Sequence, residues 1–236
     1  MFYVIMADGK GKRWDNYHEI PKHLITYQGE TLLARTVRLI RERDPEAEIV
    51  ITSHDPRYEI DGATRYEPKH NVLEIDRFTK ELIRDDMCFL YGDTFYTEEA
   101  MQTIVSRPAE PLVFFGNSRS IIAIKIRDGK LFGDLVAKVR KMYKAGEIAA
   151  CKGWQVYRLY AGLDLNERAV GKDFVQVEDA TKDFNSAADL DEEGKFQAGN
   201  SSSEPALNIC FTGDLSFTGY YRDWDGGQIR RAVLRR

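Results

Sequence analysis

The chain has 236 residues, of which 34 are Lys or Arg and 38 are Asp or Glu, so its formal charge is -4. Hydrophobic residues make up 43% of it, which supplies enough apolar surface to offset the entropy lost on folding. This composition predicts a globular protein and excludes disorder over the whole length. The mild acidity argues against a nucleic-acid-binding protein, which needs a basic face to neutralise phosphates.

The sequence also argues against a membrane span and a secretory signal. The longest apolar stretches, residues 1–7 and 121–124, are far shorter than the roughly 20 residues that a spanning helix needs. The N-terminus has no basic region before its short apolar run. Three widely spaced cysteines, Cys88, Cys151 and Cys210, predict neither a disulfide framework nor a zinc site. We therefore expect a cytoplasmic protein.

The first elements form a β-loop-α-β unit. Residues 2–6 are a continuous apolar run, typical of a strand that is buried on both faces. A polar loop over 8–22 separates it from an amphipathic helix over 30–43, and a second strand follows at 48–53. Two strands joined through a helix imply parallel pairing.

The alternation of strands and helices continues and predicts an α/β layered domain. The further expected elements are a helix over 72–84, a strand over 87–91, a helix over 97–106, strands over 112–115 and 121–127, a helix over 131–143, strands over 154–160 and 174–177, and a short acidic helix over 186–193.

The loop after the first strand is the richest in chemistry. Gly9 and Gly11 permit unusual torsions and close approach, so that backbone N–H groups can face a ligand's phosphates. Four cations lie in the same neighbourhood: Lys10, Lys12, Arg13 and Lys22. The spacing is neither that of a P-loop nor that of a dinucleotide-binding fingerprint. The loop alone therefore leaves open both phosphate binding and an ordinary glycine turn with solvated lysines.

Three segments around this loop follow one another in a specific order: Gly9-Lys-Gly11-Lys-Arg13, Pro21-Lys-His-Leu24 and Gly29-Glu-Thr-Leu-Leu33. The order resembles the nucleotidyltransferases of the sugar-phosphate and cytidylyl-transfer type, which open with a strand, G-x-G-x-R, a spacer, P-K-x-L and a small-residue turn before a helix. The resemblance implies a three-layer, Rossmann-like α/β fold, with a mixed, mostly parallel sheet flanked by helices.

Two later segments extend the resemblance. Leu90-Tyr-Gly-Asp93 ends a buried strand, like the family's G-D whose carboxylate holds Mg²⁺. Asp183-Phe-Asn-Ser-Ala-Ala-Asp-Leu190 is similar to the family's D-x-N-T-P-E-D-L, in which an Asp or Asn completes the metal site. Ser-Ala replaces Thr-Pro here, so the second ligand is either Asp183 or Asn185. The alternative for Asp93 and Asn185 is capping of a following helix.

The resemblance implies a Mg²⁺-dependent enzyme that transfers NMP from an NTP, with CTP or UTP favoured, to a phosphorylated sugar or small phospho-compound and releases pyrophosphate. It implies Arg13 and Lys22 as catalytic cations, and Asp93 with Asp183 or Asn185 as metal ligands. The expected nucleotide-binding residues are Met6, Ala7, Asp8, Gly9, Lys10, Gly11, Lys12, Asn71 and Gly92. The partners are then the NTP and the acceptor, without nucleic acid, and a homo-oligomer is left open.

Asp8 departs from the family pattern, which commonly has Gly or Ala at this position. A carboxylate that faced a triphosphate would be repelled, so we expect Asp8 to turn away or to contact base, ribose or metal. Asp8 also supports an alternative, a catalytically silent nucleotide-binding or assembly module. A nucleotide-sugar-dependent glycosyltransferase is the other alternative; an Asp-x-Asp motif would favour it, where this chain has Gly92-Asp93-Thr94.

The C-terminal part is expected to lie outside the catalytic domain. A small, polar stretch, Gly-Asn-Ser-Ser-Ser-Glu-Pro, predicts a domain over 1–195, a linker over 196–206 and a tail over 207–236. The tail runs from a strand into a Gly-Asp pair and resembles the opening strand of capsule-synthesis proteins of the CapA type. Only the beginning of such a domain fits in the chain, so we do not expect Asp214 to be catalytic. This tail alone suggests a role in surface polysaccharide synthesis.

Overall fold

The computed structural model describes residues 1–9, 11, 13–14, 20–108, 110–166 and 169–190, and the backbone of 196–198. These residues belong to the first of two units, which spans 1–199. Lys10, Lys12 and the expected tail lie outside the described residues, as does the expected linker after Ala198. Within the described part, no helix is long and apolar enough to cross a membrane.

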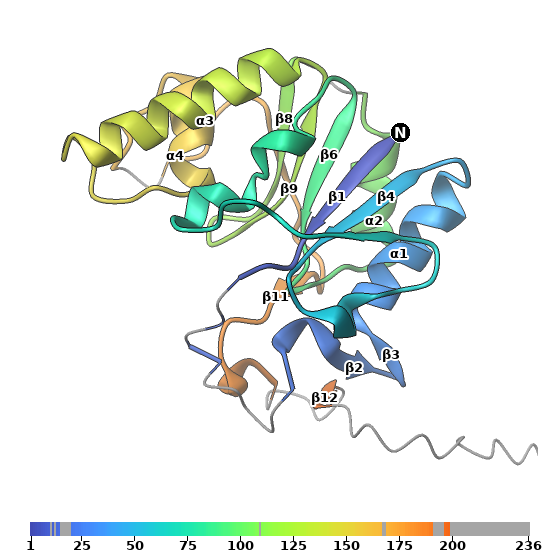
Figure 1. Cartoon of the computed structure of the whole chain (residues 1–236). Coiled ribbons are helices and arrows are strands. Elements are labelled where there is room, and N and C mark those ends of the chain that lie inside the picture. Colours follow the sequence, from blue (N-terminus) through green and yellow to red (C-terminus); the bar gives the residue numbers. More distant parts are fainter. Residues whose placement is uncertain are drawn as a thin grey trace, which may run out of the picture. The chain divides into compact units, whose positions relative to one another are not determined.

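A seven-stranded sheet forms the centre of the unit (Figure 1). Its strand order is β10 (Phe174–Gln176), β8 (Leu112–Gly116), β9 (Ile121–Ile126), β6 (Met87–Tyr91), β1 (Phe2–Met6), β4 (Glu48–Thr52) and β5 (Thr64–Tyr66). Strand β9 is antiparallel to β6 and β8, and all other neighbours pair in parallel. The predicted mixed, mostly parallel sheet is confirmed.

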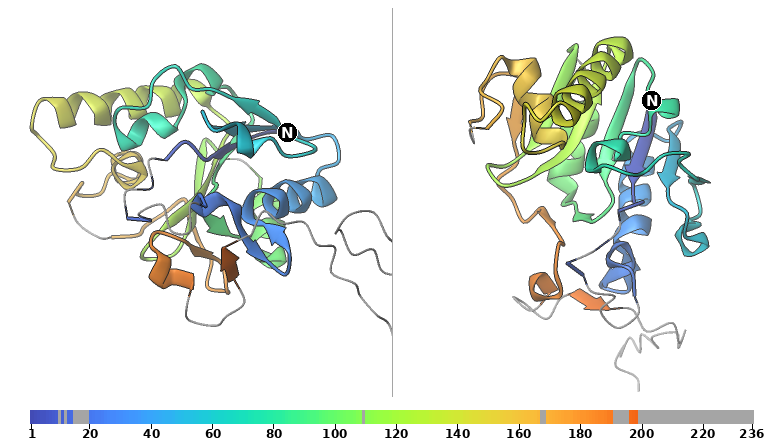
Figure 2. Two further views of the ribbon diagram at one scale, coloured as in Figure 1. Left: turned by 60° about the horizontal axis from the view of Figure 1, so that its bottom comes forward. Right: turned by 60° about the vertical axis from the view of Figure 1, so that its left-hand side comes forward.

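Helices cover both faces of this sheet (Figures 1 and 2). On one face lie α1 (Leu32–Arg43) and α2 (Glu98–Ser106), and on the other lie α3 (Gly129–Lys144) and α4 (Gly153–Ala161). Strand β1 serves both layers, because Tyr3 and Ile5 join the core beside α1 and α2, whereas Phe2, Val4 and Met6 join the core beside α3 and α4. The three-layer architecture explains the continuous apolar run of this strand.

Two small sheets lie outside the central one. Strand β7 (Thr94–Phe95) pairs antiparallel with β11 (Lys182–Asp183). Strand β2 (Ile25–Tyr27) pairs with β3 (Glu30–Thr31) and with β12 (Phe196–Ala198). The first three residues of the expected linker thus form a strand of the folded unit.

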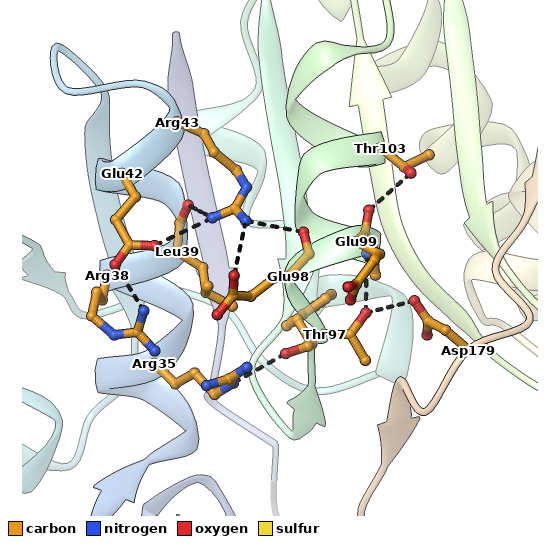
Figure 3. Close-up of polar contacts among 12 residues, drawn as sticks. Arg35, Arg38, Leu39, Glu42, Arg43, Thr97, Glu98, Glu99, Thr103 and Asp179 are labelled. Atoms are coloured by element: carbon orange, nitrogen blue, oxygen red, sulfur yellow. Dashed lines mark hydrogen bonds and ion pairs between the residues drawn. The ribbon is translucent and has the colours of Figure 1, made fainter.

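Polar contacts fix the start of α2 against its neighbours (Figure 3). From α1, Arg35 Nε donates to the carbonyl of Tyr96 at 3.1 Å and Arg43 donates to the carbonyl of Glu98 at 3.1 Å. The N-cap residue of α2, Thr97, donates its hydroxyl to Asp179 at 2.5 Å. The last of these contacts holds the segment before β11 against the start of α2, four residues before Asp183.

The helix predicted over 72–84 is wrong. Two 3₁₀ turns, Glu74–Arg77 and Lys80–Leu82, occupy this segment. The buried carboxylate of Asp76 accepts from the first two backbone N–H groups of the segment, at 3.0 and 2.8 Å. A side chain that binds nearby backbone N–H groups in this way competes with the regular helical hydrogen bonds.

The strand predicted over 154–160 is also wrong, because these residues form α4. Its aromatic residues Trp154, Tyr157 and Tyr160 recur every three residues, a spacing that places them along one side of a helix. Gly162 ends the helix in the left-handed conformation, with φ 69°. The short helix predicted over 186–193 is, in its described part, a 3₁₀ turn over Ala187–Leu190.

Candidate active site

The loops that follow β1, β4 and β6 meet at one edge of the sheet, because parallel strands end on the same side. A cleft of about 1030 Å³ opens there. The cations that line it are Arg13, Lys22, Arg77, Arg119, Lys152, Arg158 and Lys182. The carboxylates that line it are Glu74, Asp93, Asp183 and Asp189. This combination suits a ligand that carries phosphates together with a divalent cation.

A buried ion pair joins Lys22 to Asp93 at the bottom of this arrangement. Lys22 starts a 3₁₀ turn after the glycine loop, and Asp93 follows β6. The Lys22 ammonium also lies 3.4 Å from the carbonyl of Phe184. Burial raises the pKa of Asp93, but the nearby charges, Lys22 foremost, outweigh it and leave that pKa below its ordinary value. Asp93 is therefore ionised at neutral pH.

The pairing of β7 with β11 brings the segment 183–190 beside the segment that ends at Asp93. The Phe184 N–H donates to the Asp93 carbonyl at 2.8 Å, so Asp183 and Asn185 lie beside Asp93. Asp183 accepts from the Ser120 hydroxyl at 2.9 Å and from the Asn185 side-chain amide. Two carboxylates from distant parts of the chain thus border the same cleft.

Arg13 reaches this group from the glycine loop. Its guanidinium donates to Asn185 Oδ1 at 2.7 Å. The loop that carries Asn185 is itself held by Asp189, whose carboxylate accepts from the N–H groups of Asn185 and Ser186 at 2.7 Å each. Since Asn185 Oδ1 is engaged by a cation, its oxygen is a poorer metal ligand than the Asp183 carboxylate.

Asp8 turns toward β4 and β5. Its carboxylate accepts from the His54 backbone N–H at 3.1 Å, contacts His54 Nδ1 at 3.0 Å, and accepts from the Asn71 side-chain amide at 2.7 Å. Hydrogen bonding to Asp8 raises the pKa of His54 above its ordinary value. Because the Asp8 carboxylate is already engaged, the main argument for a catalytically silent module loses its basis.

Gly92, which follows β6, packs too closely against the end of β1 to carry a side chain. Gly92 N donates to the Met6 carbonyl at 3.0 Å, and a Cβ atom on Gly92 would lie 2.9 Å from that oxygen. Gly11 has φ 54°, a torsion that favours glycine, and it lines the cleft. Met6 and Ala7 are buried. Their side chains contribute to the core, so any contact with a nucleotide must come from their backbone.

A smaller cavity of about 310 Å³ shares Gly11 and Lys22 with the cleft. His23 borders it and is buried, with Nδ1 at 2.8 Å from the Tyr58 hydroxyl. Burial lowers the pKa of His23 to about 3, so its imidazole is neutral at pH 7. His23 therefore adds no charge to the cluster around Lys22.

The sequence did not indicate several residues of the cleft. Arg77 lies in the segment predicted as a helix, and Ser120 lies in a turn between β8 and β9. Neither residue belongs to a motif, because each reaches the cleft through the packing of elements that are distant in sequence. Asp189 belongs to the segment 183–190, which the sequence did single out. In the structure it holds the loop that carries Asn185.

The chain's sequence matches no protein-family profile and no curated protein. Its fold matches solved structures. An inositol-1-phosphate CTP transferase from T. maritima is similar with a TM-score of 0.51 and 11% identity, over 82% of this chain and 93% of that one. A protein from Bacillus anthracis assigned as a glucose-1-phosphate thymidylyltransferase is similar with a TM-score of 0.53 and 13% identity, over 80% and 92%.

A third structure, 4-diphosphocytidyl-2C-methyl-D-erythritol synthase from Anaerococcus prevotii, is similar with a TM-score of 0.50 and 12% identity, over 80% of this chain and 92% of that one. At such identities the likeness concerns the fold. The chain therefore has the fold of these nucleotidyltransferases, as the resemblance of its motifs implied.

Proposed function

We propose that the chain is a nucleotidyltransferase that moves NMP from an NTP, with CTP or UTP favoured, to a phosphorylated sugar or small phospho-compound. The observation that carries the proposal is the meeting of Arg13, Lys22, Asp93 and Asp183 at one cleft. These residues come from four separate segments of the sequence, and all four line the same cleft.

In this reaction an oxygen of the acceptor's phosphate attacks the α-phosphorus of the NTP. A new P–O bond forms, the bond to the leaving pyrophosphate breaks, and the electron pair of that bond stays with the pyrophosphate. Two anions must approach each other, and each pair of charges repels by about 4 kcal/mol at 4 Å and an effective dielectric near 20. Arg13 and Lys22 offset this repulsion and stabilise the charge that grows on pyrophosphate. No covalent protein nucleophile is needed.

The donor set of the cleft fits Mg²⁺. Asp93 and Asp183 are carboxylates, and Mg²⁺ binds one or two carboxylates together with substrate phosphates and water. No cluster of three or more potential ligands among His, Cys, Asp and Glu occurs in the described residues. When bound, the ion would neutralise phosphate charge and polarise the α-phosphate. Asp93 and Asp183 would hold it, with Asn185 bound to Arg13 instead.

The acceptor and the pathway belong to the same proposal. The cleft is lined by cations and by the polar side chains Asn117, Ser118 and Ser120. This lining suits a phosphorylated compound that also has free hydroxyl groups. A role in surface polysaccharide synthesis rests on the sequence of the tail alone. The cytoplasm, where NTPs are available, is the expected compartment.

Pyrophosphate release tests the proposal. Each of the four NTPs is incubated with Mg²⁺ and a panel of hexose phosphates, polyol phosphates, phosphocholine and phosphonates. At least one pair should turn over, and Asp93→Asn should lower that turnover by about 100-fold or more while the protein stays folded. Asp61→Asn, an exposed carboxylate outside the cleft, is the matched control. Absence of turnover with every pair, or full activity of Asp93→Asn, would refute the proposal.

A further inference from the structure

Arg77 lies beside the glycine loop and lines the cleft. A Cβ atom on Gly9 would lie 3.2 Å from Arg77 Nη2 and 3.3 Å from its Cζ, so the guanidinium packs directly on the Gly9 backbone. Arg77 also lines the cleft with Lys22 and Asp93. In the part of the chain that the structure describes, its guanidinium makes no hydrogen bond and no ion pair. A half-buried guanidinium in this position is available to a ligand.

The 3₁₀ turn that carries Arg77 is anchored on several sides. Its neighbour Asp76 is buried and forms an ion pair with Arg140 of α3. The other oxygen of Asp76 accepts from the two N–H groups that begin the segment. Ile75 and Phe78, on either side, are buried in the core beside α3 and α4. The backbone of Arg77 is therefore fixed before a ligand arrives.

Arg77 lies close to the candidate catalytic groups. It lines the same cleft as Lys22 and Asp93, so an anion that binds next to them is within the field of the Arg77 guanidinium.

We infer that Arg77 is a phosphate-binding residue of the nucleotide subsite, a third cation beside Arg13 and Lys22, and that Asp76 and Arg140 position it. The inference rests on the proposed function. A guanidinium offers several donors in a planar fork that matches two phosphate oxygens at once. Glycine at position 9 lets this fork lie against the loop, so that backbone N–H groups and the guanidinium can bind one triphosphate together.

Binding to the full chain tests this inference without requiring turnover. Each of the four NTPs and inorganic tripolyphosphate are titrated by calorimetry in the presence of Mg²⁺. Arg77→Gln should weaken binding about 10- to 100-fold, because a hydrogen bond to a charged group is lost. Arg77→Lys should recover part of the loss, since the charge returns without the fork. Tripolyphosphate should show the same loss as the NTP, because the effect concerns phosphates.

The matched control is Arg127→Gln. Arg127 is an exposed arginine that follows β9 at the amino end of β6, far from the cleft. The Arg127→Gln variant should bind every ligand as tightly as the wild type does. Equal affinity of wild type and Arg77→Gln would overturn the inference and leave the proposed function standing. Failure of the wild type to bind any NTP or tripolyphosphate would overturn both.

A double-mutant cycle tests the positioning role of Asp76. Asp76→Asn should weaken tripolyphosphate binding although Asp76 does not itself line the cleft. In the Arg77→Gln background the same change should have no further effect, because Asp76 acts through Arg77. Circular dichroism confirms that the variants are folded. Losses that simply add would refute the positioning role.

Discussion

Among the residues that the structure describes, two lysines are buried, and their surroundings differ. Lys22 is 7% exposed and pairs with the Asp93 carboxylate at the carboxyl end of the sheet. Lys125 in β9 is 4% exposed and lies opposite Cys88, near the amino end of β6. Its ammonium group donates to three backbone carbonyl oxygens at the end of α2. They belong to Ile104, Val105 and Arg107, at 3.1, 2.8 and 2.6 Å.

The difference separates a structural cation from a candidate catalytic one. The Lys125 ammonium has three N–H donors, and three carbonyl oxygens at the C-terminal end of α2 accept from it. These carbonyl groups have no partner within the helix itself. Lys22 faces a full negative charge and borders a cleft, so an incoming anion can take over part of its interaction. A buried lysine is therefore a candidate functional residue where it pairs with a carboxylate that lines a cleft, as Lys22 does with Asp93.

The largest effect is expected for Lys22→Met. On the transferase activity proposed above, kcat/KM should fall about 100- to 1000-fold, because a preorganised cation at the phosphates is removed. Pyrophosphate release measures the change, and urea unfolding shows that the variant is folded. If Lys22→Met kept wild-type activity, Lys22 would be a structural cation like Lys125, and the comparison would fail.

Lys125→Met should have the opposite profile. Three carbonyl groups at the end of α2 lose their donor, so the free energy of unfolding should fall by about 2–4 kcal/mol, while the activity of the folded fraction stays unchanged. Urea unfolding measures the loss. Lys130→Met, which alters an exposed lysine of α3, is the control and should change stability little. Loss of activity greater than the loss of folded protein would contradict the purely structural role.

Much of the fold was predictable because its information is local. Residues 2–6 and 87–91 are continuous apolar runs, and residues 30–43 have a helical period, so strands and a helix follow from spacing alone. The order of the motifs also predicted that Lys22 and Asp93 belong to one site. In the structure these two side chains form an ion pair.

The rest depends on contacts between residues that are distant in sequence. The segment 72–84 has a helical pattern, but Asp76 accepts from the N–H groups that begin it and also pairs with Arg140, 64 residues away. Arg77, which lines the cleft, lies at the end of a 3₁₀ turn in that segment. In the same way, nothing next to Lys125 in sequence reveals that it caps α2. Such tertiary contacts cannot be read from the period or the composition of a segment.

The smallest expected effects are on the pH dependence of stability, and they separate the two regions of the molecule. Burial lowers the pKa of Lys125 from 10.5. As the pH rises toward 10.5, the folded protein releases this proton while the unfolded chain still holds it, so stability should rise with pH in that window. Lys125→Met should remove this rise, and the pH dependence of urea unfolding measures it.

The carboxyl end of the sheet should respond in acid instead. The pKa of Asp93 lies below 3.8, because the charge of Lys22 and its neighbours outweighs burial. Below pH 3.8 the unfolded chain takes up a proton that folded Asp93 does not, so the stabilising contribution is present above this pH and is lost as the pH falls through the folded pKa. In metal-free buffer, Asp93→Asn should therefore flatten the acid limb of the stability curve and leave the alkaline rise intact. Lys125→Met should do the reverse. If Asp93→Asn and Lys125→Met changed the same limb of the stability curve, the surroundings of Lys22, which pairs with Asp93, and of Lys125 would not be independent.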